Sequence, residues 1–263
     1  MRVPLLTLAA AGAALLAPTV SASASVSAPV RPRAAEPAPH EGSVGAAELL
    51  ARVRHCVPVS RGKYRTDAHA PATVPVCGTR DAVFWKADMD IDCDGRAGAR
   101  CNARTDPFYS SMTAYRQSDG RYLDAERLPY IVVPAASGIW NHRAHGIGGG
   151  SIAAVVYRNR VRYAVVGDTG PHDIIGEASY ATARSLGIRA DPRHGGVGHG
   201  VTYIVFKNAK ARPIEDHAAA VARGELLARR FARPAEPSRP PDPRPVAEEQ
   251  DGTADVGESA EGG

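Results

Sequence analysis

The chain has 263 residues, of which 44% are hydrophobic and 23% are charged, and its formal net charge is +4 at pH 7. The charge is uneven: residues 50–210 hold 22 Lys and Arg against 14 Asp and Glu, a net +8, whereas residues 234–263 hold 2 Arg against 8 acids, a net −6. The basic side chains are scattered, without Lys/Arg runs or interleaved aromatic residues, which argues against a nucleic-acid-binding protein.

The two ends of the chain differ from its middle. Residues 1–28 begin with one Arg, continue with an apolar run and end with small residues, the layout of a secretory signal peptide. That run contains Pro18 and is too short for a membrane span, and no later stretch approaches the about 20 apolar residues that a span needs. Residues 29–42 predict a Pro/Ala-rich linker, and residues 233–263 a disordered acidic, Pro-rich tail. We therefore expect one exported, soluble domain over residues 43–232.

Within the domain, strand-like segments outnumber helical ones. Residues 43–57 predict a short helix with Ser43 as a candidate N-cap. The segment "AVFWKADMDID" predicts a strand that ends in an acidic loop. Further strands are predicted by "LPYIVVPA", "SIAAVVYRNRVRYAVVGD" with a hairpin turn at residues 158–160, and "VTYIVFKN". "GEASYATARSLG" predicts a helix that ends at Gly187, and residues 214–232 predict the last helix. This pattern is typical of a mainly β barrel or sandwich with a few short helices.

The chain contains four cysteines, Cys56, Cys77, Cys93 and Cys101. An even number in an exported chain indicates two disulfides, and four cysteines allow three pairings. We expect sequence neighbours to pair, Cys56 with Cys77 and Cys93 with Cys101. The C-x-x-C spacing of many zinc sites does not occur in the sequence.

The segment "ADMDIDCDG" places carboxylates at every second position, at Asp88, Asp90, Asp92 and Asp94. From Asp90 the pattern D-x-D-x-D-G resembles the start of an EF-hand calcium loop, whose twelfth position should be Glu. That position is Cys101 here, and flanking helices are not evident. Three interpretations stay open: a calcium site, a disulfide-stapled turn with exposed acids, and an acidic subsite for a cationic ligand.

Other catalytic signatures are weak. The histidine pairs His142/His145 and His194/His199 lie in Gly-rich segments without a zinc-binding spacing, so polar loop residues are the simpler interpretation. The sequence contains neither a G-x-S-x-G element nor a P-loop.

The segment "YAVVGDTGPHDIIGEAS" delivers Asp168 at a strand end and Glu177 at a predicted helix start. Glycosidic cleavage needs one protonated and one ionised carboxyl group, and an apolar setting beside Ile174 and Ile175 would raise the pKa of Glu177. A helix N-terminus would oppose that shift. From spacing alone, a turn residue and a first-turn helix acid remain the simpler interpretation.

The segments "ADMDIDCDG", "LPYIVVPA", "SIAAVVYRNRVRYAVVGDTG", "IIGEASYATAR" and "HGVTYIVFKN" occur in this order over residues 82–207. Together they resemble glycoside hydrolase family 75, the chitosanases of fungi and actinobacteria. The resemblance implies a six-stranded double-psi β-barrel and a secreted, inverting endo-chitosanase without metal or cofactor. It assigns Glu177 as the general acid and Asp168 as the general base, with the carboxyl groups about 6.5–9.5 Å apart as inversion requires.

The implied substrate is chitosan, a polycation whose amines carboxylates would bind. The candidates are Asp88, Asp90, Asp92 and Asp94, with Asp90 and Asp92 favoured, and also Asp173 and Trp140, the latter by stacking on sugar rings. A domain of net charge +8 repels a polycation, so carboxylates should gather around Asp168. We expect a monomer that contacts neither nucleic acid nor membrane. The alternatives are a glycosidase for another polysaccharide and a secreted calcium- or carbohydrate-binding module.

Overall fold

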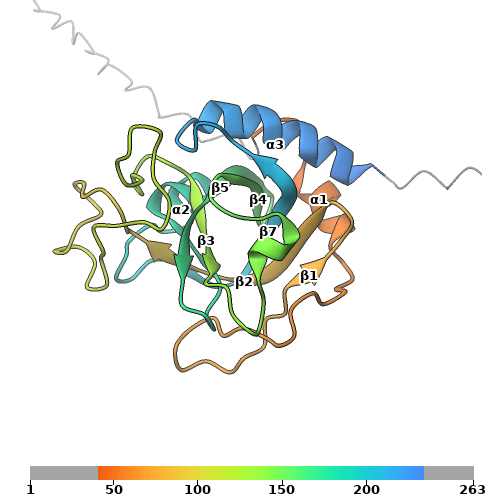
Figure 1. The fold of residues 1–263 in the computed structure, drawn as a ribbon, viewed down its shortest axis with the longest axis horizontal. Helices are drawn as coiled ribbons and strands as arrows, with labels where there is room; N and C mark the ends of the chain where they lie inside the picture. Colours follow the sequence, from red (N-terminus) through yellow and green to blue (C-terminus); the bar gives the residue numbers. More distant parts are fainter. Residues whose placement is uncertain (1–40, 234–263) are drawn as a thin grey trace, which may run out of the picture. The chain divides into compact units, whose positions relative to one another are not determined.

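A computed structural model describes residues 41–233 (Figure 1). The predicted signal peptide, residues 29–40 of the predicted linker and the tail from residue 234 lie outside the described residues. The elements are α1 Ala46–Arg52, β1 Cys77–Gly78, β2 Ala82–Asp92, β3 Tyr130–Pro134, the 3-10 turn η1 His142–His145, β4 Ser151–Tyr157, β5 Arg160–Gly170, β6 Glu177–Ser179, α2 Tyr180–Leu186, β7 Val197–Lys210 and α3 His217–Ala232.

Within residues 41–233 the strands form one sheet in the order β1-β2-β6-β3-β5-β4-β7, and β7 also pairs with β2. This additional pairing closes six strands into a barrel, with β1 added beside β2. The pairs β2–β6 and β3–β5 are parallel, and the other pairs are antiparallel. The mainly β single domain with a six-stranded barrel core is therefore confirmed. No helix of the described residues combines the length and apolar character that crossing a membrane requires.

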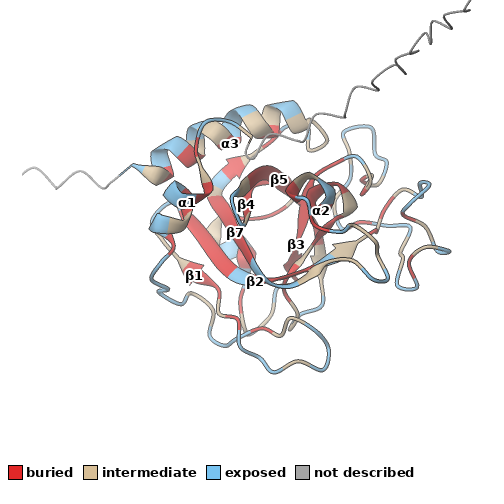
Figure 2. Cartoon of the chain, turned by 180° about the vertical axis from the view of Figure 1, so that it is seen from behind, coloured by how far each residue is buried: buried red, intermediate tan, exposed pale blue. Residues whose placement is uncertain are grey.

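Two hydrophobic clusters use opposite faces of the barrel wall. All six barrel strands contribute to one cluster, which fills the barrel; among its members are Trp85 and Tyr203, whose rings stack with centroids 5.2 Å apart. The other cluster lies between the wall and the helices α1 and α3. Figure 2 shows the buried side of α3 turned toward the strands and its exposed side turned away. Closure thus provides a rigid core, because all six barrel strands contribute buried side chains to one interior.

Three predicted boundaries are wrong. The acidic segment is part of β2, which continues as a strand to Asp92, because β6 pairs with it there. Glu177 lies on β6 and not at a helix start, since α2 begins at Tyr180 with Ser179 as its N-cap. The N-cap of α1 is Gly45, and Ser43 hydrogen-bonds to the α3 side chain Glu225 instead.

Other local predictions are confirmed. The two disulfides join Cys56 to Cys77 and Cys93 to Cys101. The hairpin between β4 and β5 turns at residues 158–159, and α2 ends at Gly187, whose φ of 73° is left-handed. These features depend on short-range chemistry, which the sequence carries directly.

Helix α3 approaches the barrel wall closely at Gly224. Its buried face consists of Ala220, Gly224, Ala228 and Phe231, a spacing that puts small residues against the sheet. A Cβ at Gly224 would collide with the ring of Tyr163, a fully buried side chain of β5.

Replacing Gly224 by Ala should therefore destabilise the protein. In an open helix the change stabilises by about 1 kcal/mol, but here the collision with Tyr163 should lower the free energy of unfolding by about 1–3 kcal/mol. Urea denaturation measures the effect. Ala222→Gly, at an exposed position of the same helix, calibrates the helix propensity. A stabilised Gly224→Ala variant would contradict the close packing of α3 on β5.

Candidate active site

Strand pairing brings acidic residues from distant parts of the sequence together. Asp90 of β2 lies opposite Glu177 of β6, and Asp92 lies opposite Ser179. Strand β6 also pairs with β3, and β3 pairs with β5, which carries Asp168. Four neighbouring strands, β2, β6, β3 and β5, therefore form the floor of the candidate site.

The acidic side chains of β2 and β6 face away from the barrel interior. Met89 and Ala178 belong to the cluster that fills the barrel. Because side chains alternate between the faces of a strand, their neighbours Asp90 and Glu177 point to the outer face. Asp92 follows Asp90 by two residues and shares that face.

A β-bulge brings Asp168 to the same outer face. Val166 fills the barrel, so simple alternation would turn Asp168 inward as well. The register of β5 against β3 shifts there, however, and Asp168 pairs with Val132, a residue of the outer cluster. The skipped residue is Gly167, where a Cβ would lie 2.5 Å from Cγ of Tyr130. The bulge and its glycine thus orient the Asp168 carboxyl group.

Two backbone amides hold the Asp168 carboxylate. The N–H groups of Ala114 and Thr169 both donate to its Oδ1 atom, each at 2.7 Å. The residue is only 6% exposed, and this burial raises its pKa, whereas the two hydrogen bonds lower it. Donors aimed at the ionised form favour a carboxylate that stays charged and can accept a proton.

Glu177 has a different environment. Burial raises its pKa to about 7, and the charges of Asp90, Asp94 and Asp168 add to the effect. No hydrogen bond among the described residues stabilises its ionised form. Gly170 provides the space that it occupies, since a Cβ there would lie 2.7 Å from Oε2 of Glu177. The group is therefore protonated over much of the acidic and neutral pH range.

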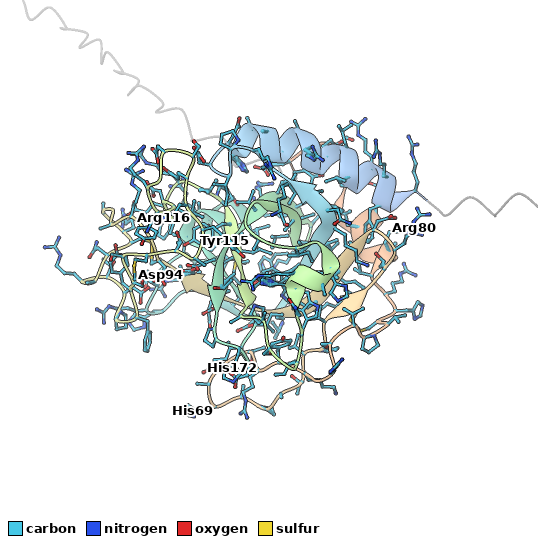
Figure 3. The ribbon with its side chains drawn as sticks, in the orientation of Figure 1. His69, Arg80, Asp94, Tyr115, Arg116 and His172 are labelled. Atoms are coloured by element: carbon cyan, nitrogen blue, oxygen red, sulfur yellow. A yellow bond between two sulfur atoms is a disulfide. The ribbon has the colours of Figure 1, made fainter. Side chains whose placement is uncertain are left out.

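Asp92 and Asp94 extend the acidic cluster. Burial, followed by the charge of Asp94, raises the pKa of Asp92 well above its ordinary value. Burial raises the pKa of Asp94 to about 6, although Ser110 N–H donates to its Oδ1 atom at 2.7 Å. Asp90 is exposed at the edge of the cluster. The predicted gathering of carboxylates around Asp168 is thus present, and Figure 3 shows Asp94 on the side of the barrel away from Arg80.

Asp88 is buried beneath this surface. It is 5% exposed, and its Oδ1 atom has no hydrogen-bond partner among the described residues. Burial, followed by the charge of Asp90, raises its pKa to about 8. The carboxyl group packs on Gly176, where a Cβ would collide with Oδ1 of Asp88. Asp88 is thus a neutral, buried group next to Glu177 and lies below the surface that a substrate would contact.

Two other predicted site residues lie apart from the cluster. Trp140 is 3% exposed and packs against Trp85, with ring centroids 6.3 Å apart, so it presents no open ring face for a sugar. Stacking on a sugar, as predicted, would require this ring to be uncovered. Asp173 is partly exposed in the loop between β5 and β6, and its carboxylate forms a 3.7 Å ion pair with Arg65.

The calcium interpretation does not match the geometry. In residues 41–233 no three His, Cys, Asp or Glu side chains are grouped so that they could hold a metal ion. Asp90 and Asp92 belong to an extended strand, whereas an EF-hand needs a loop between two helices. His142 is buried, and its pKa is lowered to about 4 by that burial.

Sequence reasoning missed the loop between β2 and β3. This loop supplies the backbone donors of Ser110 and Ala114 and the phenol of Tyr115. Burial raises the pKa of Tyr115, the Arg143 charge lowers it, and the Asp168 charge adds a smaller increase. Any residue other than proline can supply a backbone N–H, so the sequence does not reveal these donors. The one sequence signal was Gly167 beside Asp168 in a strand, because a glycine inside a strand often marks a bulge at a functional position.

Comparison with known proteins identifies the family. The family model of fungal chitosanases of glycosyl hydrolase group 75 matches residues 89–229, more than half of the chain. An endo-chitosanase from Aspergillus fumigatus is 31% identical over 169 residues, which cover 59% of this chain and 71% of that protein. The chain belongs to glycosyl hydrolase group 75.

Other relatives match over a smaller share of their length. Endo-chitosanase C of Aspergillus oryzae is 32% identical over 135 residues, 49% of this chain and 33% of the relative. Endo-chitosanase B of Aspergillus oryzae (strain ATCC 42149 / RIB 40) is 31% identical over 134 residues, 48% of this chain and 56% of the relative. The chain thus spans between a third and somewhat more than half of the length of these two proteins.

The raised pKa values predict that stability falls with rising pH. The folded-state pKa values of Asp88 and Glu177, about 8 and about 7, exceed their ordinary 3.8 and 4.5. The folded state therefore binds more protons, and stability present at low pH is lost as pH rises toward 8. His142 acts in the opposite sense, but only below its ordinary pKa of 6.5. The melting temperature should fall between about pH 6.5 and 8, where the carboxyl groups dominate.

Comparing the parent with the variant Asp88→Asn isolates the contribution of Asp88 to the pH dependence of the melting temperature. Asparagine cannot ionise, so the variant should lose less of its melting temperature between about pH 6.5 and 8 than the parent does. Asp119→Asn, at an exposed surface position, should retain the parent's pH dependence. The assigned role of Asp88 fails if the parent and Asp88→Asn show equal slopes.

Proposed function

We propose that this protein is a secreted endo-chitosanase, which hydrolyses β-1,4 glycosidic bonds between glucosamine units with inversion. The observation that carries the proposal is the pairing of a protonated Glu177 with an amide-held Asp168 carboxylate on one barrel face. The family and the names of the relatives support chitosan as the substrate. The two disulfides are consistent with an extracellular protein.

The two carboxyl groups have different roles in this mechanism. Glu177, whose pKa is about 7, donates a proton to the glycosidic oxygen as the bond breaks. Asp168 accepts a proton from a water molecule that attacks the anomeric carbon from the opposite face. The amides of Ala114 and Thr169 fix the Asp168 oxygen. The product is an α-anomer, the proton lost by Glu177 is replaced from solvent, and Asp168 releases the proton it took.

The surrounding acids provide the substrate specificity. A protonated glucosamine amine is bound best by ionised carboxylates at the surface, which describes Asp90 at the rim and Asp94 above pH about 6. Burial raises the pKa of Asp92 well above its ordinary value, which makes it a poorer anionic partner for an amine than Asp90 or Asp94. Asp173 can bind a substrate amine only if its ion pair with Arg65 breaks. The protein acts as a monomer without metal or cofactor.

The first test is reducing-end release from highly deacetylated chitosan by the purified protein, Asp168→Asn and Glu177→Gln. Each variant should lose about 10³-fold in kcat/KM, because each removes one proton transfer. Proton NMR of the first product should show the α-anomer. A folded Asp168→Asn or Glu177→Gln variant with near-parental rate would reassign the pair. Activity on cellulose or peptidoglycan but not chitosan would overturn the substrate.

Gly170→Ala tests whether the Glu177 carboxyl group must stay in place. The new methyl group would lie 2.7 Å from Oε2 and push the acid away from the reacting bond. Displacement of about 1 Å lowers rates by up to about 10²-fold, so kcat should fall by about 10- to 100-fold. The matched control is Gly198→Ala, since nothing lies within 4 Å of a Cβ at that exposed position. Equal activity of the two variants would contradict this placement of Glu177.

A further inference from the structure

A recess of opposite charge lies next to the acidic cluster. It has a volume of about 1110 Å³ and is enclosed by the glycine-rich loop that follows η1, the end of β7 and one side of α3. Tyr115 lines it at one edge. The neighbouring residue, Ala114, donates to Asp168, so this basic groove begins where the candidate active site ends.

The cations of the basic groove are Arg143, Lys210, Arg212 and Arg223. Among the residues that the structure describes, no acidic side chain lines the groove, and none of the four cations forms a salt bridge. Four like charges around one recess repel each other unless an anion neutralises them. The groove is therefore electrostatically complementary to a ligand with several negative charges.

The groove also offers apolar contacts. Leu226 of α3 is 58% exposed there, and Ala219 and Ala222 form the adjoining surface. Asn208 and the backbone of Gly146–Gly149 add polar groups on the opposite wall. Apolar patches beside hydrogen-bonding groups fit the faces and hydroxyls of sugar rings, and guanidinium groups bind carboxylate or phosphate in a bidentate manner.

The proposed substrate of the active site cannot occupy this groove favourably. Tyr115 stands at the boundary, because it lines the groove together with Arg143 and directly follows Ala114, which donates to Asp168. A protonated chitosan chain is attracted up to this point and repelled beyond it. The ligand of the basic groove must therefore differ chemically from a polycation.

We propose that the basic groove is a binding site for an anionic glycan, a polymer whose sugar units carry carboxylate or phosphate groups. This binding is separate from bond hydrolysis and does not depend on the proposed catalytic pair. It would hold the protein on an anionic polysaccharide surface while the acidic face remains free for its substrate.

Isothermal titration calorimetry with the full-length protein tests the site. Polygalacturonate and phosphorylated dextran are the carboxylate and phosphate probes, and unmodified dextran is the neutral one. At low ionic strength the charged probes should bind and the neutral one should not, and about 0.5 M salt should abolish binding. The variant Arg143→Gln/Lys210→Gln/Arg223→Gln should lower the association constant at least about 10-fold, because it removes three charge-assisted contacts.

A matched variant separates a site from general charge attraction. Arg52→Gln/Arg54→Gln/Arg61→Gln removes three exposed cations that do not line the groove, and its affinity should stay within about twofold of the parent. Equal losses in both variants would overturn the proposal. Circular dichroism and chitosan cleavage check that both variants fold. Absence of chitosan cleavage in the parent would affect only the proposed function.

The acidic C-terminal residues are the other possible occupant. Residues 248–263 contain six acids and no Lys or Arg. If the full-length protein fails to bind polygalacturonate but a chain ending at Arg233 binds it, the segment occupies the groove and the glycan proposal is overturned. Binding by both forms with similar affinity supports the glycan.

Discussion

The short strand β6 is the constraint on which the candidate site depends. It lies between β2 and β3, and its three residues connect the acidic end of β2 to the half of the barrel that carries Asp168. Parallel pairing sets Glu177 opposite Asp90 with their side chains on one face. Because a shift of one residue would turn Glu177 into the barrel, the register of β6 determines whether Glu177 and Asp168, the proposed catalytic pair, share one face.

Gathering so many carboxyl groups in one place opposes folding, and the raised pKa values show that their ionised forms are disfavoured there. Burial and mutual repulsion keep Asp88 and Glu177 protonated near neutral pH, so the charge that the cluster carries is smaller than its number of acids. The closed barrel can hold such a cluster because all six strands pack around one interior that includes Trp85 and Tyr203. The same burial and repulsion that cost stability raise the pKa of Glu177 to the range that the proposed proton donor needs.

The distribution of charge resolves the conflict between a basic domain and the cationic substrate proposed for it. Acids occupy the outer face of β2, β6 and β5, while the basic groove lies beyond Tyr115. Net charge governs the attraction or repulsion of a ligand at long range, but salt largely screens this interaction beyond about 8–10 Å. At the distance of contact the local arrangement decides, so a protein of net positive charge can present separate surfaces for polycations and for polyanions.

Local chemistry in the sequence determined the mainly β class, the disulfide pairs, a hairpin within residues 158–160 and the end of α2, and the family motifs pointed to Asp168 and Glu177. The tertiary structure decided what periodicity does not contain. It made the acidic segment a strand, because β6 supplies a hydrogen-bonding partner far away in sequence. It buried Trp140 against Trp85. The sequence alone does not distinguish a tryptophan that packs in a core from one that is exposed to a ligand. It also placed the Ala114 amide on Asp168 across 54 residues of sequence, a contact that only the closed barrel brings about.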